Sequence, residues 1–159
     1  MAVSPSLIAE AIRWRRDFHA CPELGYQEQE TSRRVAELLA SFGLQVHRGL
    51  AGTGVVATLE NGPGPVIGLR ADMDALPITE LSDVGYKSRN PGVMHACGHD
   101  GHSAMLLATA AHLAQTRCFR GTVHFVFQPA EENLGGAPKM VEEGLFARFP
   151  IHANYPLHN

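Results

Sequence analysis

The sequence has few cysteines, no long apolar run and no excess of charge of one sign. Three cysteines among 159 residues are an odd number and too few for a disulfide framework, so we expect a cytoplasmic protein. The longest apolar run falls far short of the roughly 20 residues that cross a bilayer. The first residues show no basic stretch followed by an apolar one, so we expect no signal peptide.

The charge balance also limits the classes of partner. Lys and Arg number 13 and Asp and Glu 16, which gives a formal net charge of −3. This balance gives no electrostatic reason to expect nucleic acid or a membrane surface as a partner. With 45% hydrophobic and 18% charged residues, the chain is typical of one globular domain. Nine histidines are many for this length, and three of them lie within 95–102.

Hydrophobic periodicity predicts four helices and five strands. The first helix begins at Ser4-Pro5 and ends at Cys21-Pro22. The remaining elements are helices over 27–42, 103–115 and 137–143, and strands over 44–47, 54–59, 66–70, 122–128 and 153–157.

The order of these elements predicts the sheet. Turn residues over 61–65 predict that the strands on either side pair as antiparallel neighbours. The strand–helix–strand unit over 66–128 predicts two parallel strands joined by a right-handed crossover. We therefore expect an α/β fold with a mixed, mainly parallel sheet flanked by helices.

Polar side chains follow three of the predicted strands. Asp72 and Asp74 come after one strand, Glu131 and Glu132 after the next, and His158 after the last. Ligands of open α/β sheets bind outside the carboxyl ends of the strands. The long irregular stretch 73–94 is of a length that is usually functional. The sequence therefore predicts a site at this edge of the sheet.

The segment HACGHDGH over 95–102 carries metal-binding chemistry. Gly98 lets the backbone bend, so that the thiolate of Cys97 and the imidazole of His99 can face one centre. Thiolate, imidazole and carboxylate together suit zinc, and imidazole with carboxylate also suits manganese. The adjacent Glu131 and Glu132 point in different directions on an extended segment. One can bind a metal while the other acts as a general base toward water. Metal-activated water and a general base are the usual requirements for hydrolysing an amide.

Each of these residues also has a structural interpretation. Asp72 and Asp74 could satisfy backbone donors of a loop, and the two glutamates could be solvated. Cys97 alone is more often a small apolar packing residue than a metal ligand. His158 alone would have no role in a metal site. The other histidines and cysteines are expected to be structural, with no ligand beside them: His19, His47, His112, His124, His152, Cys21 and Cys118.

A thiol hydrolase is a further alternative. Cys97 would then act as the nucleophile and a histidine as its base. The adjacent glutamates and the additional histidines have no role in that scheme, so the metal site is the favoured interpretation.

Four ordered motifs resemble a known family. They are FHACPELGY over 18–26, GLRADMDALPI over 68–78, MHACGHDGH over 94–102 and FQPAEE over 127–132. Together they are similar to the amidohydrolase branch of the aminoacylase/carboxypeptidase metallopeptidases. That branch includes hippurate hydrolase, the auxin-conjugate hydrolases and N-acetyldiaminopimelate deacetylase. The resemblance covers essentially the whole chain.

The resemblance implies a zinc-exopeptidase-like catalytic domain with two divalent metal ions, zinc or manganese. The implied metal ligands are Cys97, which can bridge the ions, with His99, Glu132 and His158. Glu131 matches the general base that takes a proton from water and returns it to the leaving amine. Asp74 matches an acid behind the metal site that orients a ligand. The implied substrate is a small N-acyl amino acid, cleaved at its amide bond.

Family members are usually more than twice as long as this chain. We therefore expect residues 1–159 to be part of a catalytic domain, without the dimerisation or lid domain and the C-terminal part. A full-length form is expected to be a homo-oligomer. The shorter chain is expected to expose apolar surface and to self-associate. An alternative function is a catalytically incomplete, metal-binding fragment of such an enzyme.

Overall fold

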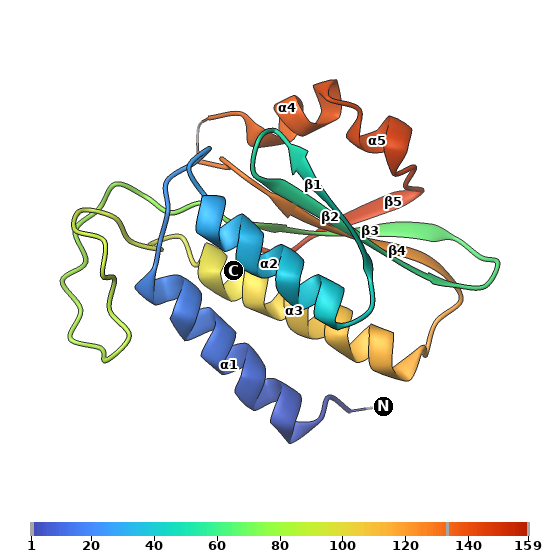
Figure 1. The fold of residues 1–159 in the computed structure, drawn as a ribbon, viewed down its shortest axis with the longest axis horizontal. Coiled ribbons are helices and arrows are strands. Elements are labelled where there is room, and N and C mark those ends of the chain that lie inside the picture. The colour runs from blue at the N-terminus through green and yellow to red at the C-terminus, as the bar shows by residue number, and fades with distance from the viewer. Residues whose placement is uncertain (1, 133, 159) are drawn as a thin grey trace.

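The computed structural model describes residues 2–132 and 134–158, which form a sheet with helices on both faces (Figure 1). In chain order the elements are α1 (Pro5–Ala20), α2 (Gln29–Ser41), β1 (Gln45–Leu50), β2 (Gly54–Asn61), β3 (Val66–Asp72), α3 (His99–Thr116), β4 (Gly121–Gln128), α4 (Gly136–Glu142), α5 (Leu145–Arg148) and β5 (Ala153–Pro156). All nine predicted elements are present, and the short helix α5 is an addition that the sequence pattern did not indicate.

The sheet is mixed and flanked by helices, as the sequence predicted, although two of its four strand pairs are parallel and two antiparallel, so it is not mainly parallel. Its strand order is β1-β2-β4-β3-β5. The β1–β2 and β2–β4 pairs are antiparallel, and the β3–β4 and β3–β5 pairs are parallel. The predicted pairing across the turn at 61–65 is wrong, because β4 lies between β2 and β3. Residues 55–61 of β2 and residues 66–72 of β3 each pair with β4 along the whole strand. This long-range pairing takes precedence over the local turn.

The parallel pairs bring the carboxyl ends of three strands together. Asp72 is the register partner of Gln128, and Arg70 is the partner of Pro156. The chain continues this alignment beyond the strands, because the Met73 amide donates to the Gln128 carbonyl at 3.0 Å. Residues that follow β3, β4 and β5 therefore emerge at one edge of the sheet.

Two apolar cores hold the helices to the sheet. Helices α1, α2 and α3 lie on one side of the sheet and α4 and α5 on the other (Figure 1). On the first side, Val55, Ala57 and Leu59 of β2 are buried in the larger core with Trp14 and Phe18 of α1. The alternate residue of β2 faces the smaller core, whose members are Leu50, Ala51, Val56, Val126, Met140 and Leu145. This alternation is the period-two pattern of a strand covered on both faces.

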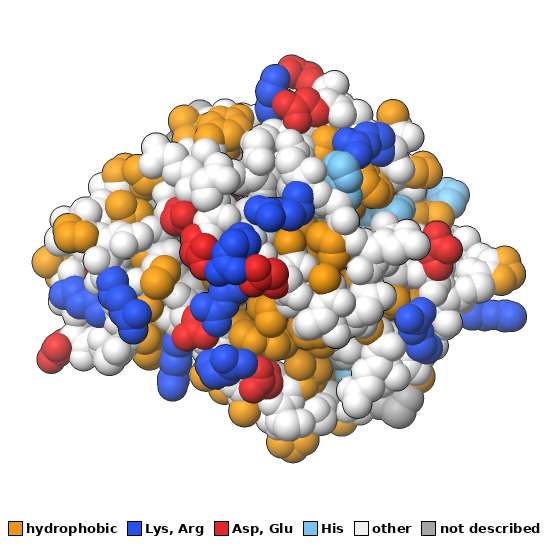
Figure 2. All heavy atoms as spheres, in the orientation of Figure 1, with side chains coloured by type: hydrophobic (Ala, Val, Ile, Leu, Met, Phe, Trp, Pro, Cys, Tyr) orange, Lys and Arg blue, Asp and Glu red, His pale blue; other side chains and the backbone are white. Residues whose placement is uncertain are grey.

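The surface carries both charges and exposed apolar side chains. Over α2, basic and acidic side chains alternate, as where Arg33 lies between Glu30 and Glu37 (Figure 2). Ile8 and Ile12 of α1 and Met105 of α3 are about half exposed and line a hollow between those helices. Over 2–132 and 134–158, no helix combines the length and apolar character required to cross a membrane.

Candidate metal centre

Helix α3 begins at His99, four residues before the predicted start, and this places two histidines in its first turn. Gly98 precedes the helix with φ +80°, a left-handed conformation that glycine adopts without strain. The bend lies between Cys97 and His99, as the sequence predicted. His99 and His102 are three residues apart, so they share one face of the helix.

Three predicted ligands lie together. Cys97, His99 and Glu132 each offer a ligand atom, and these atoms lie within 4.8 Å of one another. His99 Nε2 is 3.8 Å from Glu132 Oε1 and 3.9 Å from Glu131 Oε2. The His99 side chain is buried, whereas Cys97 is exposed and both glutamates are partly exposed. One side of the cluster is therefore fixed within the protein, and the other is open to solvent.

Hydrogen bonds fix the orientation of His99. Its Nδ1 lies 2.8 Å from the backbone carbonyl of Asp74 and 3.2 Å from Asp74 Oδ1. A carbonyl oxygen only accepts, so Nδ1 carries the hydrogen and the lone pair of Nε2 is free toward the glutamates. Burial opposes protonation of His99, but the hydrogen bond to Asp74 and the charges of Asp72 and Asp74 outweigh it and raise its pKa.

Asp74 connects His99 to the loop that carries the glutamates. Its buried carboxylate accepts a hydrogen bond from the Glu132 amide at 3.0 Å. Burial favours the neutral form, but hydrogen bonds from His99 and from the Glu132 and Glu131 amides outweigh it and lower the pKa of Asp74. Asp74 thus lies behind His99, in position to orient it.

Glu28 is a support of the glutamate loop that sequence reasoning missed. It is fully buried just before α2, and its Oε1 accepts a hydrogen bond from the Ala130 amide at 2.8 Å. Its Oε2 accepts from the Thr53 hydroxyl at 2.7 Å. Ala130 has φ +50°, a strained conformation for a residue other than glycine. Glu131 therefore lies between two anchored amides, that of Ala130 on Glu28 and that of Glu132 on Asp74.

We expect Glu28→Ala to lower the free energy of unfolding by about 2–4 kcal/mol, because two buried donors lose their acceptor. Glu28→Gln should cost less, since its carbonyl can accept from Ala130 and the Thr53 hydroxyl can turn to accept from its amide. Urea unfolding of both variants measures the difference. Equal losses would contradict the role of these hydrogen bonds.

Burial raises the pKa of Glu28. The stability of the wild type and that of Glu28→Gln should therefore depend differently on pH. The folded protein holds the proton more tightly than the unfolded chain. Stability should therefore fall as pH rises from the ordinary glutamic acid value of about 4.3 through the raised value. Glu28→Gln should lack that part of the pH dependence, which unfolding curves across this range would show.

Cys97 lies among carboxylates. Hydrogen bonding to Glu132, burial and the charges of Glu132, Glu131 and Asp74 raise the pKa of its thiol to about 11. A free nucleophilic cysteine needs a lowered pKa, so these surroundings disfavour the thiol hydrolase. A cation bound among the same groups would reverse the effect and deprotonate the thiol.

His158 lies close to this cluster but outside its tightest part. Among the described residues, the donor set within 4.8 Å comprises Cys97, His99 and Glu132 and does not include His158. Its exposed ring lies 5.6 Å from the ring of His102, measured between centroids. It follows β5, whose end is held to β3 by the hydrogen bond from Leu157 to Arg70.

Most of the remaining histidines make structural contacts, but His19 departs from the expectation. His47 contacts Arg148, His124 contacts Thr58, and His152 contacts the backbone of Val66. His19 is buried between two carboxylates, with Nδ1 2.8 Å from Asp100 and Nε2 3.1 Å from Glu80. It joins α1, the start of α3 and the loop after β3, a connection that sequence spacing does not show.

The site adjoins an apolar hollow. Its volume is about 320 Å³, and it is lined by Leu24, Gly25, Asp74, Ala75, Leu76, Pro77, Glu132 and Leu134. Two of the lining residues are Glu132, a member of the cluster, and Asp74, which supports His99. An apolar group seated there would lie beside the metal-binding side chains.

The donor set fits a divalent metal ion. A thiol, an imidazole with a free nitrogen and a carboxylate match the ligands of zinc, and the open side of the cluster leaves room for water or substrate. The hydrogen bond from Nδ1 of His99 to a carbonyl is the support that metal-binding histidines usually have.

Comparisons with known proteins identify the family of this chain. The model of Peptidase family M20/M25/M40 matches residues 68–159. The hippurate hydrolase of Campylobacter jejuni is 48% identical over 154 residues, which cover 96% of this chain and 40% of that protein. An N-acyl-L-amino acid amidohydrolase of Geobacillus stearothermophilus is 50% identical over 139 residues, covering 86% of this chain and 38% of that protein.

A solved structure has the same fold. The Bacillus subtilis YXEP protein, described as a dinuclear metal binding peptidase from the M20 family, superposes with a TM-score of 0.92 at 40% identity. The match covers 98% of this chain and 44% of that one. This chain spans about 40% of the length of the curated relatives named above. The matched family model spans more than half of the sequence and includes the candidate ligands after β3, and the chain therefore belongs to Peptidase family M20/M25/M40.

Proposed function

We propose that this chain carries the metal site of an amidohydrolase that cleaves the amide bond of N-acyl amino acids. The observation that carries the proposal is the convergence of Cys97, His99 and Glu132, with the carboxylate of Glu131 beside them. The names of the relatives support the reaction class, since two are described as hydrolases of hippurate and of N-acyl amino acids.

Four residues would hold the metal. Cys97, His99 and Glu132 provide a thiol, an imidazole and a carboxylate, and His158 would complete the set from the end of β5. Two ions, zinc or manganese, are proposed for a complete site, in line with the dinuclear description of the Bacillus subtilis relative. A bound ion would supply Lewis acidity toward the amide carbonyl and would lower the pKa of a water.

Glu131 would act as the general base and then as the general acid. Its side chain is 35% exposed, while its Oε2 lies 3.9 Å from His99 Nε2. It can therefore accept a proton from the attacking water and give it to the leaving amine. Asp74 would act as a positioning residue, since it contacts both His99 and the Glu132 amide. The apolar hollow would receive an apolar part of the substrate.

A second candidate function is that of a metal-binding portion without catalysis. It is favoured by the chain's span of about 40% of its relatives. In that case residues 1–159 would form part of a catalytic domain, and further residues would be needed to complete the metal shell and the substrate pocket. We propose that the complete protein is a homo-oligomer and that the exposed apolar side chains of α1 and α3 let this chain self-associate.

Metal uptake and hydrolysis separate the two candidates. We expect the purified chain to bind about one equivalent of zinc or manganese. His99 should be one of the ligands, because its Nδ1 is held by the Asp74 carbonyl. Equilibrium dialysis with elemental analysis measures uptake, and release of free amino acid from hippurate or acetyl-amino acids with added manganese measures hydrolysis. Uptake with hydrolysis supports the amidohydrolase, and uptake without it supports the second candidate. Absence of uptake would contradict both.

A further inference from the structure

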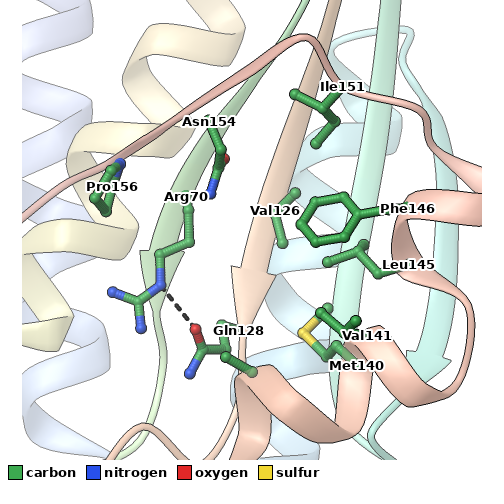
Figure 3. A pocket seen from close by; sticks show the side chains of 11 residues that line it. Arg70, Val126, Gln128, Met140, Val141, Leu145, Phe146, Ile151, Asn154 and Pro156 are labelled. Atoms are coloured by element: carbon green, nitrogen blue, oxygen red, sulfur yellow. Dashed lines mark hydrogen bonds between the residues drawn. The ribbon is translucent and has the colours of Figure 1, made fainter.

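A second hollow lies on the face of the sheet that α4 and α5 cover. Its volume is about 160 Å³, and residues of β3, β4, β5, α4 and α5 line it (Figure 3). None of its described lining residues belongs to the metal cluster or to the hollow beside that cluster. It is therefore a separate site, and the proposed hydrolysis gives it no role.

One wall of this hollow is polar. Arg70, Gln128 and Asn154 form it, and among the described lining residues Arg70 alone carries a charge. The Arg70 side chain is 14% exposed, and its Nε donates to Gln128 Oε1 at 2.9 Å (Figure 3). Its Nη1 donates to Asp72 Oδ2 at 2.8 Å. These two hydrogen bonds hold the guanidinium in one position.

The polar wall offers hydrogen-bond donors. Over 2–132 and 134–158, Nη2 of Arg70 and the amide nitrogen of Gln128 have no acceptor. Asp72 lies outside the hollow, and its other oxygen contacts Nδ1 of His102 at 2.7 Å. A donor without an acceptor in a largely buried place is unfavourable, and an arginine binds a carboxylate more strongly than a neutral group. The polar wall therefore favours a ligand that carries a carboxylate.

The opposite wall is apolar and limits the size of the ligand. It consists of Val126, Met140, Val141, Leu145, Phe146 and Ile151 (Figure 3). An apolar cavity of about 150 Å³ holds one benzene ring. A hollow of about 160 Å³ therefore has room for one ring or one branched aliphatic group.

Both walls are fixed before any ligand binds. A Cβ added to Gly68 of β3 would lie 2.6 Å from Asn154 Oδ1 and 2.7 Å from Ile151 Cδ1. One residue of each wall therefore packs directly against the backbone of β3. Preorganised walls reduce the entropy that binding costs.

We propose that this hollow binds a small apolar carboxylate. The carboxylate would contact Arg70, Gln128 and Asn154, and the apolar group would lie against α4 and α5. A mostly apolar lining with a few polar groups that fix the orientation is the usual character of a small-molecule site. The inference does not rest on the proposed metal site, because the two share no residue of the described chain.

Titration of the full chain with benzoate tests the proposal, because benzoate carries one ring and one carboxylate. With ¹³C-labelled methyl groups, we expect benzoate to shift the resonances of Met140 and Ile151. Its ring protons should give nuclear Overhauser effects to both methyl groups. Benzamide has the same ring without the charge and should bind at least about tenfold more weakly, since hydrogen bonds to a charged group are stronger. Saturating zinc should leave the benzoate shifts at Met140 and Ile151 unchanged.

Two variants at exposed positions of the hollow sharpen the test. Ala137→Leu, on α4, should fill part of the hollow and weaken benzoate binding about tenfold. Asn154→Asp places a negative charge in the polar wall and should weaken benzoate binding by a similar factor, while benzamide binding changes less than about twofold. Ala147→Leu, exposed on α5 and outside the lining, is the matched control and should bind benzoate as the wild type does.

The position of the bound ring decides the outcome, and it is measured on the wild-type chain whether or not a variant folds. Shifts confined to the methyl groups of Leu24, Leu76 and Leu134 would place benzoate beside the metal cluster and overturn the inference. Unchanged resonances of Met140 and Ile151 would overturn it as well. Equal affinity for benzoate and benzamide would overturn the assignment of a carboxylate ligand. Failure to hydrolyse hippurate would count against the proposed function and leave this inference standing.

Discussion

We expect the double variant Cys97→Ser/His99→Ala to retain no zinc or manganese after dialysis. The two substitutions remove two of the three donors whose atoms lie within 4.8 Å of one another. A serine hydroxyl is a poor substitute for a thiolate, and alanine offers no donor, so Glu132 would remain as a lone carboxylate. Metal content after dialysis, measured by elemental analysis, checks the expectation. Cys118→Ser/His112→Ala is the matched control, since both residues lie outside the donor groups of the described chain.

The same variant should lose the stabilisation that metal gives to the folded state. At a metal concentration 100 times the dissociation constant, binding raises the free energy of unfolding by about 2.7 kcal/mol. Thermal unfolding with and without added zinc should therefore show a metal-dependent shift in the wild type and in the control variant. A shift of equal size in Cys97→Ser/His99→Ala would show that the metal binds elsewhere, and would contradict the ligand assignment.

The candidate ligands could be predicted because their chemistry is encoded locally. Cys97 and His99 are separated by a single glycine, and the structure shows the backbone bending there with φ +80°. Glu131 and Glu132 lie three and four residues after the end of β4, and parallel pairing with β3 brings them to the edge where Asp74 lies. Element type, parallel pairing and the edge of the sheet were enough to bring these residues together.

Apart from Asp74, which the family resemblance implied, the supports of the site could not be predicted, because each joins distant parts of the chain. Glu28 contacts Ala130 across 102 positions, and Asp72 contacts His102 across 30. A glutamate at the start of an amphipathic helix has the pattern of a solvated charge, and no periodicity shows that Glu28 is buried. The strand order failed for the same reason: the turn at 61–65 is local, whereas the insertion of β4 between its neighbours is decided by pairing over the whole strand.

We expect Glu131→Gln to lower the rate of hippurate hydrolysis by about 10²–10⁴-fold, the range that a general base contributes. Glutamine keeps the size of the side chain but cannot take a proton from water. Metal content should stay at the wild-type level, because the three converging donors are Cys97, His99 and Glu132. Initial rates of glycine release with added manganese give the rate, and elemental analysis gives the metal. Glu142→Gln, an exposed glutamate on α4, is the matched control.

Equal rates for Glu131→Gln and the wild type would remove the base role from Glu131. A parallel loss of rate and metal would instead make Glu131 a ligand, since its Oε2 lies 3.9 Å from His99 Nε2 and Glu132 Oε1 lies at 3.8 Å. The backbone on both sides of Glu131 is held, because Glu28 accepts a hydrogen bond from the Ala130 amide and Asp74 accepts one from the Glu132 amide. Loss of rate without loss of metal is the result that a general base predicts, and Glu28→Ala should weaken hydrolysis through the same loop while leaving both glutamates in the sequence.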